Sequence, residues 1–267
     1  MDVYHMAYNE LIKKIPSLRS KTETEDAINQ YTDWFYPFSF TNGASTVVTN
    51  DQVHQIHQSR ASLIFPYLDD LFFEKWSLVS CCDIACNQGW FGTQIALRGA
   101  KKVVGIDARA NHIRMAEKIK ELSGIPNISF EEGNLFTINR KKTGTFTITL
   151  FLGILYHIDN PMGALRIVRS ITESLCVIET QVARGNPVID CTWGSETVKR
   201  SGPGIAVLSS DEKHVVGENA LTFVPSIGAL YAMLFAVGFS RIYQCVPPQT
   251  VNEQYRTNDR VILFAHV

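Results

Sequence analysis

The chain has 267 residues, of which 45% are hydrophobic and 19% are charged, close to the averages of globular proteins. This length fits one large α/β domain with an appended segment, and the composition excludes a disordered, collagen-like or coiled-coil protein. Twenty-five Lys and Arg oppose 26 Asp and Glu, so the net charge of −1 creates no overall field for polyanions or anionic membranes. A nucleic-acid partner is therefore disfavoured, although a local basic patch is compatible with a neutral total.

Targeting and cysteine patterns narrow the class further. The longest apolar stretch, Leu221 to Phe239, is interrupted by Pro225 and falls short of the about 20 apolar residues of a membrane span. The first ten residues carry acids and no apolar signal core, so we expect a cytoplasmic location and no membrane partner. Six cysteines include no Cys-x-x-Cys pair, which predicts neither a disulfide scaffold nor a metal site.

Apolar runs alternate between strand and helix periodicity from Leu78 onward. We predict seven strands, at residues 78–84, 103–106, 128–131, 146–151, 176–179, 241–246 and 261–265. We predict helices at residues 90–98, 111–123, from 161 onward, and 226–237. This alternation indicates an α/β fold with a Rossmann-like, mostly parallel seven-stranded sheet covered by helices on both faces. A hairpin-length loop joins the last two strands, so we expect one of them to run antiparallel at the edge.

Two segments fall outside this rhythm. Residues 1–77 begin with a helical stretch and continue through aromatic side chains from Trp34 to Phe40. Residues 184–222 are rich in Gly and Pro, which predicts a long irregular insertion, and such loops are often functional lids. We therefore expect an N-terminal lid segment at 1–77 and a second domain at 78–267 with a lid inserted at 184–222.

Ligands of open α/β sheets bind beyond the carboxyl ends of the strands, so the residues after each strand are informative. The first strand continues into the loop Asp83-Ile84-Ala85-Cys86-Asn87-Gln88-Gly89. Small residues in this loop let backbone amides approach a ligand, while Asp83 suits a cationic amino-acid tail. Asp107, 18 residues after Gly89, suits two ribose hydroxyls, and Asn134 with Leu135 suits the edge and face of an adenine. Tight packing is the alternative explanation of the loop alone, but together these groups indicate a ligand with an adenosine and an ammonium group.

At this point the chain resembles the class I S-adenosylmethionine-dependent methyltransferases over residues 78–267. The loop at 83–89 is similar to their motif DxGxGxG, with Ala85 and Asn87 in place of two glycines, a departure expected to narrow the loop. The runs at 153–157, 177–180, 223–226 and 238–239, and the aromatic segment at 34–38, resemble the tRNA wobble-uridine (carboxy)methyltransferases.

The resemblance implies roles for particular residues. It implies cofactor contacts, in addition to those of Asp83, Asn87 and Gly89, at Ala85, Asp107, Ala108, Arg109, Asn134, Leu135, Leu152 and Tyr156. It implies that Arg260 lies where the family holds the carboxylate of carboxy-S-adenosylmethionine. The lysine that completes this grip in the family is absent beside Pro37 and Phe38, which favours ordinary S-adenosylmethionine. The alternative for Arg260 is a surface arginine paired with Asp259 or another acid.

Methyl transfer needs an in-line acceptor, and a base matters only where the acceptor must lose a proton. His157 is the candidate base, with capping of the following helix as its alternative role, and Tyr156 is a candidate contact for cofactor or acceptor. Glu179 either orients an acceptor hydroxyl or pairs with an arginine. Tyr36 is either core or part of an acceptor platform. We expect His54 and His57 to lie on a solvated or lid-facing helix.

The leading hypothesis is an O- or N-methyltransferase that uses S-adenosylmethionine and a small-molecule acceptor bound by Arg260, Tyr36 and Glu179. The first alternative is a tRNA wobble-uridine (carboxy)methyltransferase. The second is a cofactor-binding interaction protein without catalysis, suggested by the altered Ala85 and Asn87.

Overall fold

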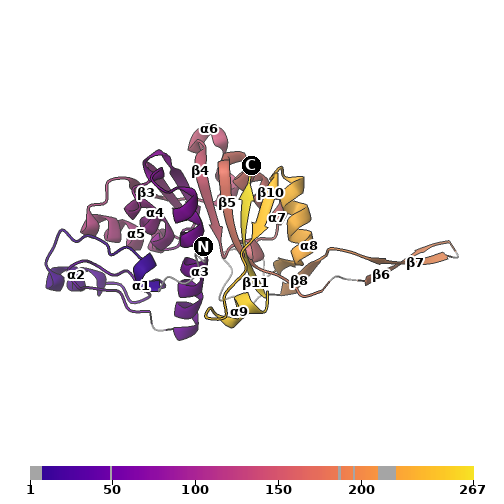
Figure 1. Cartoon of the computed structure of the whole chain (residues 1–267), viewed down its shortest axis with the longest axis horizontal. Coiled ribbons are helices and arrows are strands. Elements are labelled where there is room, and N and C mark those ends of the chain that lie inside the picture. The colour runs from indigo at the N-terminus through magenta and orange to yellow at the C-terminus, as the bar shows by residue number, and fades with distance from the viewer. Residues whose placement is uncertain (1–7, 49, 186–187, 195, 210–220) are drawn as a thin grey trace.

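The computed structural model describes residues 8–48, 50–185, 188–194, 196–209 and 221–267 (Figure 1). Its centre is a seven-stranded sheet in the order β10-β11-β5-β4-β1-β2-β3. These strands are β1 (Ser80–Ile84), β2 (Lys102–Asp107), β3 (Ile128–Glu132), β4 (Phe146–Leu152), β5 (Thr172–Gln181), β10 (Arg241–Gln244) and β11 (Arg260–His266). All seven predicted strands are present, and the predicted Rossmann-like fold class is confirmed.

The strand directions differ from the sequence prediction in one respect. β11 runs antiparallel to both of its neighbours, β5 and β10, so it lies inside the sheet, while β10 forms the edge. The expectation of one antiparallel strand is confirmed, but its placement at the edge is wrong. The expected hairpin-length loop is also wrong, because residues 245–259 join the two strands and include the short helix α9 (Glu253–Arg256). A reversal of chain direction does not decide which of the two strands reaches the interior.

Helices cover both faces of the sheet and enclose two apolar cores. α3 (Asp51–Leu71), α4 (Trp90–Leu97) and α5 (Ala110–Ser123) pack on one face, and α7 (Pro161–Ile171) and α8 (Ile227–Ala236) on the other. Their ends follow local signals: Gly124 closes α5 with a φ of 65°, and the side chain of Asn160 caps α7, which has Pro161 in its first turn. The shorter helices are α1 (Tyr8–Leu11), α2 (Lys21–Ile28), α6 (Arg140–Thr143) and α9 (Glu253–Arg256).

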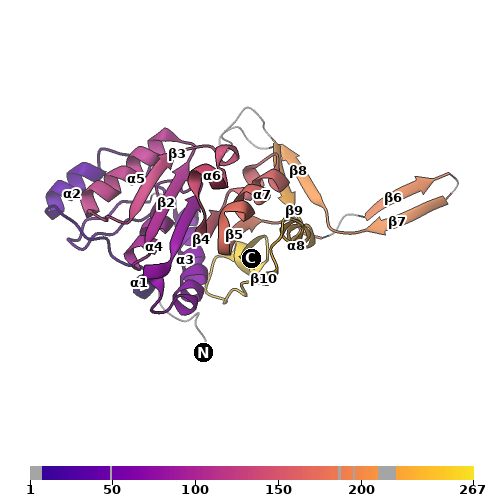
Figure 2. The ribbon, with the colours of Figure 1, turned by 90° about the horizontal axis from the view of Figure 1, so that it is seen from above.

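The insertion is more regular than its composition suggests. β6 (Val188–Trp193) and β7 (Glu196–Ser201) form one antiparallel ribbon, and β8 (Ile205–Ser209) and β9 (Leu221–Pro225) form a second. The prediction of an irregular segment is therefore wrong for the described residues, because Gly and Pro separate the strands here without interrupting them. Figures 1 and 2 show the β6–β7 ribbon extending away from the body of the protein. No helix of the described residues combines the length and the apolar character that a membrane crossing requires.

The aromatic segment at 33–40 is fastened to the loop that follows β1. Gln88 accepts a hydrogen bond from the Phe35 backbone N–H at 2.8 Å and donates one to the Asp33 carbonyl at 2.7 Å. The indole N–H of Trp90 donates to the Pro37 carbonyl at 3.0 Å. The segment therefore lies against the carboxyl end of β1, as expected of a cover, although several of its aromatic side chains are themselves core residues.

We expect Gln88→Ala to lower the free energy of unfolding by about 2 to 3 kcal/mol, because it leaves two backbone groups without partners. Hydrogen exchange at the Phe35 amide should accelerate. Gln94→Ala is the matched control, since Gln94 makes the same pair of bonds to the backbone of Lys13. It should destabilise the protein comparably without affecting Phe35, and unchanged Phe35 exchange in Gln88→Ala would contradict the assigned role of Gln88.

Candidate functional site

The strand order reverses between β1 and β4, which lie side by side in the middle of the sheet. From β1 the chain moves outward through β2 and β3, and it then returns to β4 and continues to β5 on the other side. Crevices at such reversal points are the ligand sites of open α/β sheets. Most of the sequence-predicted site residues follow the carboxyl ends of β1 to β5 and therefore gather at this edge.

The loop after β1 keeps a glycine-type backbone in spite of its substitutions. Ala85, Asn87 and Gly89 have φ values of 56°, 53° and 76°, all in the left-handed region. L-residues adopt this region at a cost of about 1 to 2 kcal/mol each. The backbone conformations of Ala85 and Asn87 are therefore strained. Gly89 has no substitute, since a Cβ there would lie 2.2 Å from the Phe130 ring. All three positions that are glycines in the motif are therefore left-handed in this loop, including Ala85 and Asn87.

Asp83 lies beneath this loop with a buried carboxylate. Its Oδ2 accepts a hydrogen bond from the Gly92 N–H, at 2.9 Å, in the first turn of α4. Burial raises the pKa of Asp83 to about 7, and the bond from Gly92 acts in the opposite direction. A buried acid of this kind gains strongly from a cation placed nearby, which agrees with the predicted contact to a cationic tail.

Asp107 organises the neighbouring part of the edge. Its Oδ2 accepts the Asn87 backbone N–H at 2.8 Å, and its Oδ1 accepts the backbone N–H and Nε of Arg109 at 2.9 and 3.1 Å. The Asn87 Oδ1 is buried without a hydrogen-bond partner among the described residues. The structure thus brings Asp107, Asn87 and Arg109 together, with a carboxylate and an unused amide oxygen beside the loop.

The remaining predicted cofactor residues line the same edge. Ala108 is exposed between Asp107 and Arg109, and Leu135 and Leu152 are half-buried. The side-chain oxygen of Asn134 accepts the Phe136 N–H at 2.9 Å, so it caps the short turn after β3. This bond leaves the Asn134 amide N–H groups as the donors available for a ligand.

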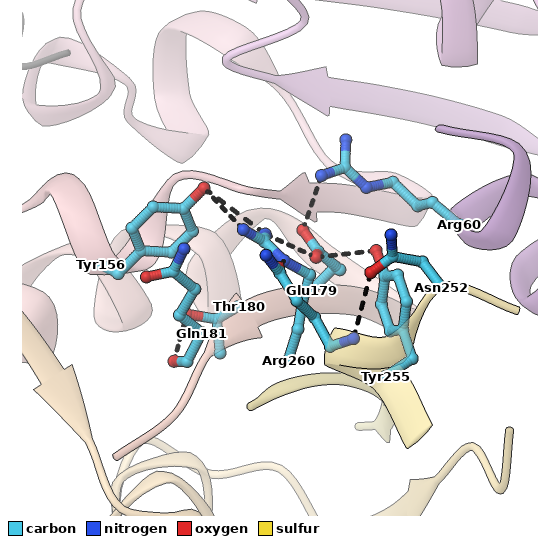
Figure 3. A network of polar contacts seen from close by, with 9 residues as sticks. Arg60, Tyr156, Glu179, Thr180, Gln181, Asn252, Tyr255 and Arg260 are labelled. Atoms are coloured by element: carbon cyan, nitrogen blue, oxygen red, sulfur yellow. Dashed lines mark hydrogen bonds and ion pairs between the residues drawn. The ribbon is translucent and has the colours of Figure 1, made fainter. Parts of the chain in front are cut away.

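A buried polar cluster occupies the end of β5 (Figure 3). Glu179, which is fully buried, receives Arg60 from α3 at 3.0 Å and Arg260 from β11 at 2.8 Å. The Tyr255 hydroxyl donates to the same carboxylate at 3.0 Å, and the Arg260 guanidinium lies 3.4 Å from the Tyr156 hydroxyl. Glu179 therefore pairs with arginines, which is the second of its two predicted roles.

This cluster carries a net positive charge, because two guanidinium groups face one carboxylate. Burial by itself would raise the pKa of Glu179, but Arg60 and Arg260 hold it below its usual range. Arg260 does not pair with Asp259, which binds Arg184 instead. Arg260 therefore pairs with an acid, as its alternative predicted, but it is buried and not on the surface. The second guanidinium of the cluster favours an anionic group nearby.

Sequence reasoning missed Arg60. Its guanidinium lies 5.8 Å from the centre of the Phe91 ring and 3.1 Å from the position of a Cβ on Gly153, so it reaches the reversal point from α3. The only signal in the sequence was helical spacing, since Arg60 lies three residues after His57 and therefore shares one face of α3 with it.

His57 is buried and faces Phe35 and Tyr36 of the aromatic segment, which is the lid-facing one of its two predicted environments. Its ring lies 4.2 Å from the ring of Tyr36, and neither ring nitrogen has a hydrogen-bond partner among the described residues. Burial and then Arg60 hold the pKa of His57 well below its usual range, with the Phe35 backbone acting in the opposite direction. His57 is thus neutral at physiological pH beside the cluster.

The other predicted catalytic and substrate residues lie near one another. Tyr156 and His157 follow β4, with ring centres 4.2 Å apart. The side chain of Asn160, not of His157, caps α7. Tyr36 is buried, with its ring parallel to that of Trp90 at 5.9 Å, so it belongs to the core that faces the cluster. Within the described parts of the chain, no group of three His, Cys, Asp or Glu is arranged to hold a metal ion.

Comparisons with known proteins agree with this geometry. Residues 76–199 match the model of a methyltransferase domain family. A tRNA U34 carboxymethyltransferase of Haemophilus influenzae (strain PittEE) is 25% identical over 181 residues, which cover 66% of this chain and 50% of that protein. The chain spans about half the length of the curated relatives it matches.

Two solved structures have the same fold. The N-terminal domain of EvdMO1, crystallised in the presence of SAH and D-fucose, aligns with a TM-score of 0.65 at 16% identity, covering 93% of this chain and 97% of that domain. The magnesium protoporphyrin IX methyltransferase of Synechocystis PCC 6803, with bound SAH, aligns with a TM-score of 0.53 at 14% identity, covering 83% and 89%.

The sheet order, the left-handed loop after β1 and the match of residues 76–199 to a methyltransferase domain are typical of class I S-adenosylmethionine-dependent methyltransferases. These findings support the expected class of enzyme and S-adenosylmethionine as its cofactor. The residues present fit this cofactor, because the loop keeps its left-handed path and the buried Asn87 Oδ1 offers an unused acceptor.

We expect Ala85→Gly to stabilise the protein by about 0.5 to 1 kcal/mol. Glycine removes the strain of the left-handed conformation, and this gain exceeds the larger conformational entropy that glycine gives the unfolded chain. Ala96→Gly is the control: Ala96 lies inside α4, where glycine should destabilise by about 1 kcal/mol. Denaturant unfolding of both variants measures the difference. A loss of stability in Ala85→Gly would mean that packing of its methyl group outweighs the strain.

Proposed function

We propose that the chain transfers the methyl group of S-adenosylmethionine to an oxygen or nitrogen of a small molecule. The observation that carries this proposal is the aromatic segment at 33–40, which Gln88 and Trp90 fasten against the loop after β1. A covered edge suits a small acceptor better than a large one. The net charge of −1 also favours this choice, and the structural neighbour EvdMO1 was crystallised with a monosaccharide.

The cofactor supplies a methyl group that is bonded to a sulfonium sulfur. After transfer, the demethylated cofactor is a neutral thioether. In the proposal, Asp107 accepts the ribose hydroxyls, and Asp83 favours the cationic amino-acid tail through the loop. The segment at 33–40 excludes water from the transfer. His157, which follows β4, is the candidate base, because burial and Arg60 lower the pKa of His57 and make it a poor proton acceptor.

An acceptor screen separates this proposal from its alternatives. The protein is incubated with methyl-labelled S-adenosylmethionine and either a small-molecule extract or bulk tRNA. We expect label in the small-molecule fraction and none in tRNA. Label in tRNA alone would overturn the small-molecule proposal. If all label stays on the cofactor with either acceptor fraction, a binding protein without catalysis is favoured.

We expect Asp107→Ala to weaken SAH binding by about 2 to 4 kcal/mol, roughly 30-fold to 1000-fold, because charge-assisted hydrogen bonds to the ribose are lost. Isothermal calorimetry measures the effect. Glu132→Ala is the matched control, since Glu132 is an exposed acid paired in register with Asp107 across β2 and β3, and its affinity should change less than twofold. Equal affinities of wild type and Asp107→Ala would place the ribose elsewhere.

Carboxymethyl transfer to a tRNA wobble uridine is the second candidate, and the buried pair Arg60 and Arg260 favours it. The absence of a lysine near Pro37 favours ordinary S-adenosylmethionine. Arg60, however, supplies a second cation from α3 beside Arg260. The uncompensated positive charge suits either a carboxylate on the transferred group or an acidic group on the acceptor.

Arg260→Lys distinguishes the two, because it keeps the charge beside Glu179 but loses the planar fork of the guanidinium. If Arg260 binds an acidic acceptor, the wild-type affinities for S-adenosylmethionine and for its carboxy derivative should lie within about threefold of each other. Arg260→Lys should then change neither affinity by more than twofold from the wild-type value. A preference of tenfold or more for the carboxy derivative, lost in Arg260→Lys, would instead establish the carboxymethyl candidate. Arg184→Lys, in the exposed pair with Asp259, is the control.

A further inference from the structure

A cavity of about 830 Å³ lies outside the reversal-point crevice, between α3 and residues 248–256. This volume falls within the about 300 to 1,000 Å³ typical of small-molecule sites. Both walls are held in place: the Ser59 hydroxyl accepts the Asn252 N–H at 2.8 Å, and the Gln254 side chain accepts from Arg260 Nε at 3.0 Å. The cavity is thus built against the buried cluster and not on a free loop.

The lining is mostly polar and has no net charge, with Ile56, Pro248 and Val251 as its apolar residues. Gln52, Gln55, Ser59 and Ser62 form one stripe on α3, at helical spacing, and the opposite face of this helix packs into the core. Thr250, Asn252 and Gln254 contribute further amide and hydroxyl groups from the other wall. The charged residues of the lining are one acid, Glu253, and one base, Arg256, so the cavity has no net charge.

Tyr8 gives a second and independent observation. It lines the cavity, and its hydroxyl is buried without a hydrogen-bond partner among the described residues. Burial raises the pKa of Tyr8, so the phenol stays protonated and is able to donate. An unpaired buried hydroxyl costs about 1 to 3 kcal/mol, so a polar group that reaches it would be favoured.

We propose that this cavity binds a neutral, hydroxyl-rich group, of which a sugar ring is the simplest example. Amide side chains both donate and accept hydrogen bonds, as sugar hydroxyls do, whereas an anion needs donors alone. A nucleobase is bound by stacking between aromatic or apolar faces, and Tyr8 is the one aromatic residue in the lining. The cavity site is independent of the methyl-transfer proposal.

The test is ligand-observed NMR of the full chain with D-glucose, D-galactose, D-mannose and L-rhamnose as probes. At least one sugar should bind with a millimolar Kd, and Gln55→Leu and Tyr8→Phe should each weaken its binding by fivefold or more. Gln30→Leu is the control, an exposed glutamine near the end of α2. All variants should bind SAH as wild type does, which reports that they are folded.

Three outcomes would overturn the inference. The first is the absence of binding by every sugar at 50 mM to a protein that binds SAH. The second is sugar binding that neither Gln55→Leu nor Tyr8→Phe changes, which would move the site elsewhere. The third is tighter binding of uridine or inorganic phosphate than of any sugar, which would assign the cavity to a nucleoside or an anion. Failure of SAH binding alone would contradict the methyl-transfer proposal and leave a positive sugar result standing.

Discussion

The buried carboxylate of Glu179 is the interaction on which the arrangement of the site depends. It draws Arg60 from α3 and Arg260 from β11 to the end of β5, three segments far apart in the sequence. Its Oε1 also accepts the Tyr255 hydroxyl from α9. Removing one partner of such a buried pair costs about 3 to 5 kcal/mol. The same carboxylate therefore holds both α3 and β11 to the end of β5.

The loop after β1 is a second constraint, and it explains why the substituted motif still fits a methyltransferase. The cofactor loop of this class needs a particular backbone path, and here Ala85 and Asn87 follow that path at a cost in local strain. Asp107 offsets part of this cost by accepting the Asn87 N–H. Gln88, in the same loop, fastens the aromatic cover, so the loop conformation and the closure of the edge are coupled.

The charges of the site suggest how donor and acceptor are separated. Carboxylates, Asp83 and Asp107, lie beside the loop after β1, while the excess positive charge lies beyond β5. A cationic donor and an anionic or neutral acceptor would thus meet opposite potentials on either side of the reversal point. The neutral cavity behind Gln254 adds a region where hydroxyl groups are favoured over ions.

The sequence by itself determined the seven strands of the central sheet, the helices α4, α5, α7 and α8, and the residues at the carboxyl ends of the strands, because periodicity, capping residues and the topology rule for parallel sheets are local or general. The position of β11 inside the sheet, the regular ribbons of the insertion and the burial of His57 came only with the tertiary structure. Arg60 was invisible for the same reason. Its partner, Glu179, lies more than a hundred residues away, and only the packing of α3 on the sheet brings the two charges into contact.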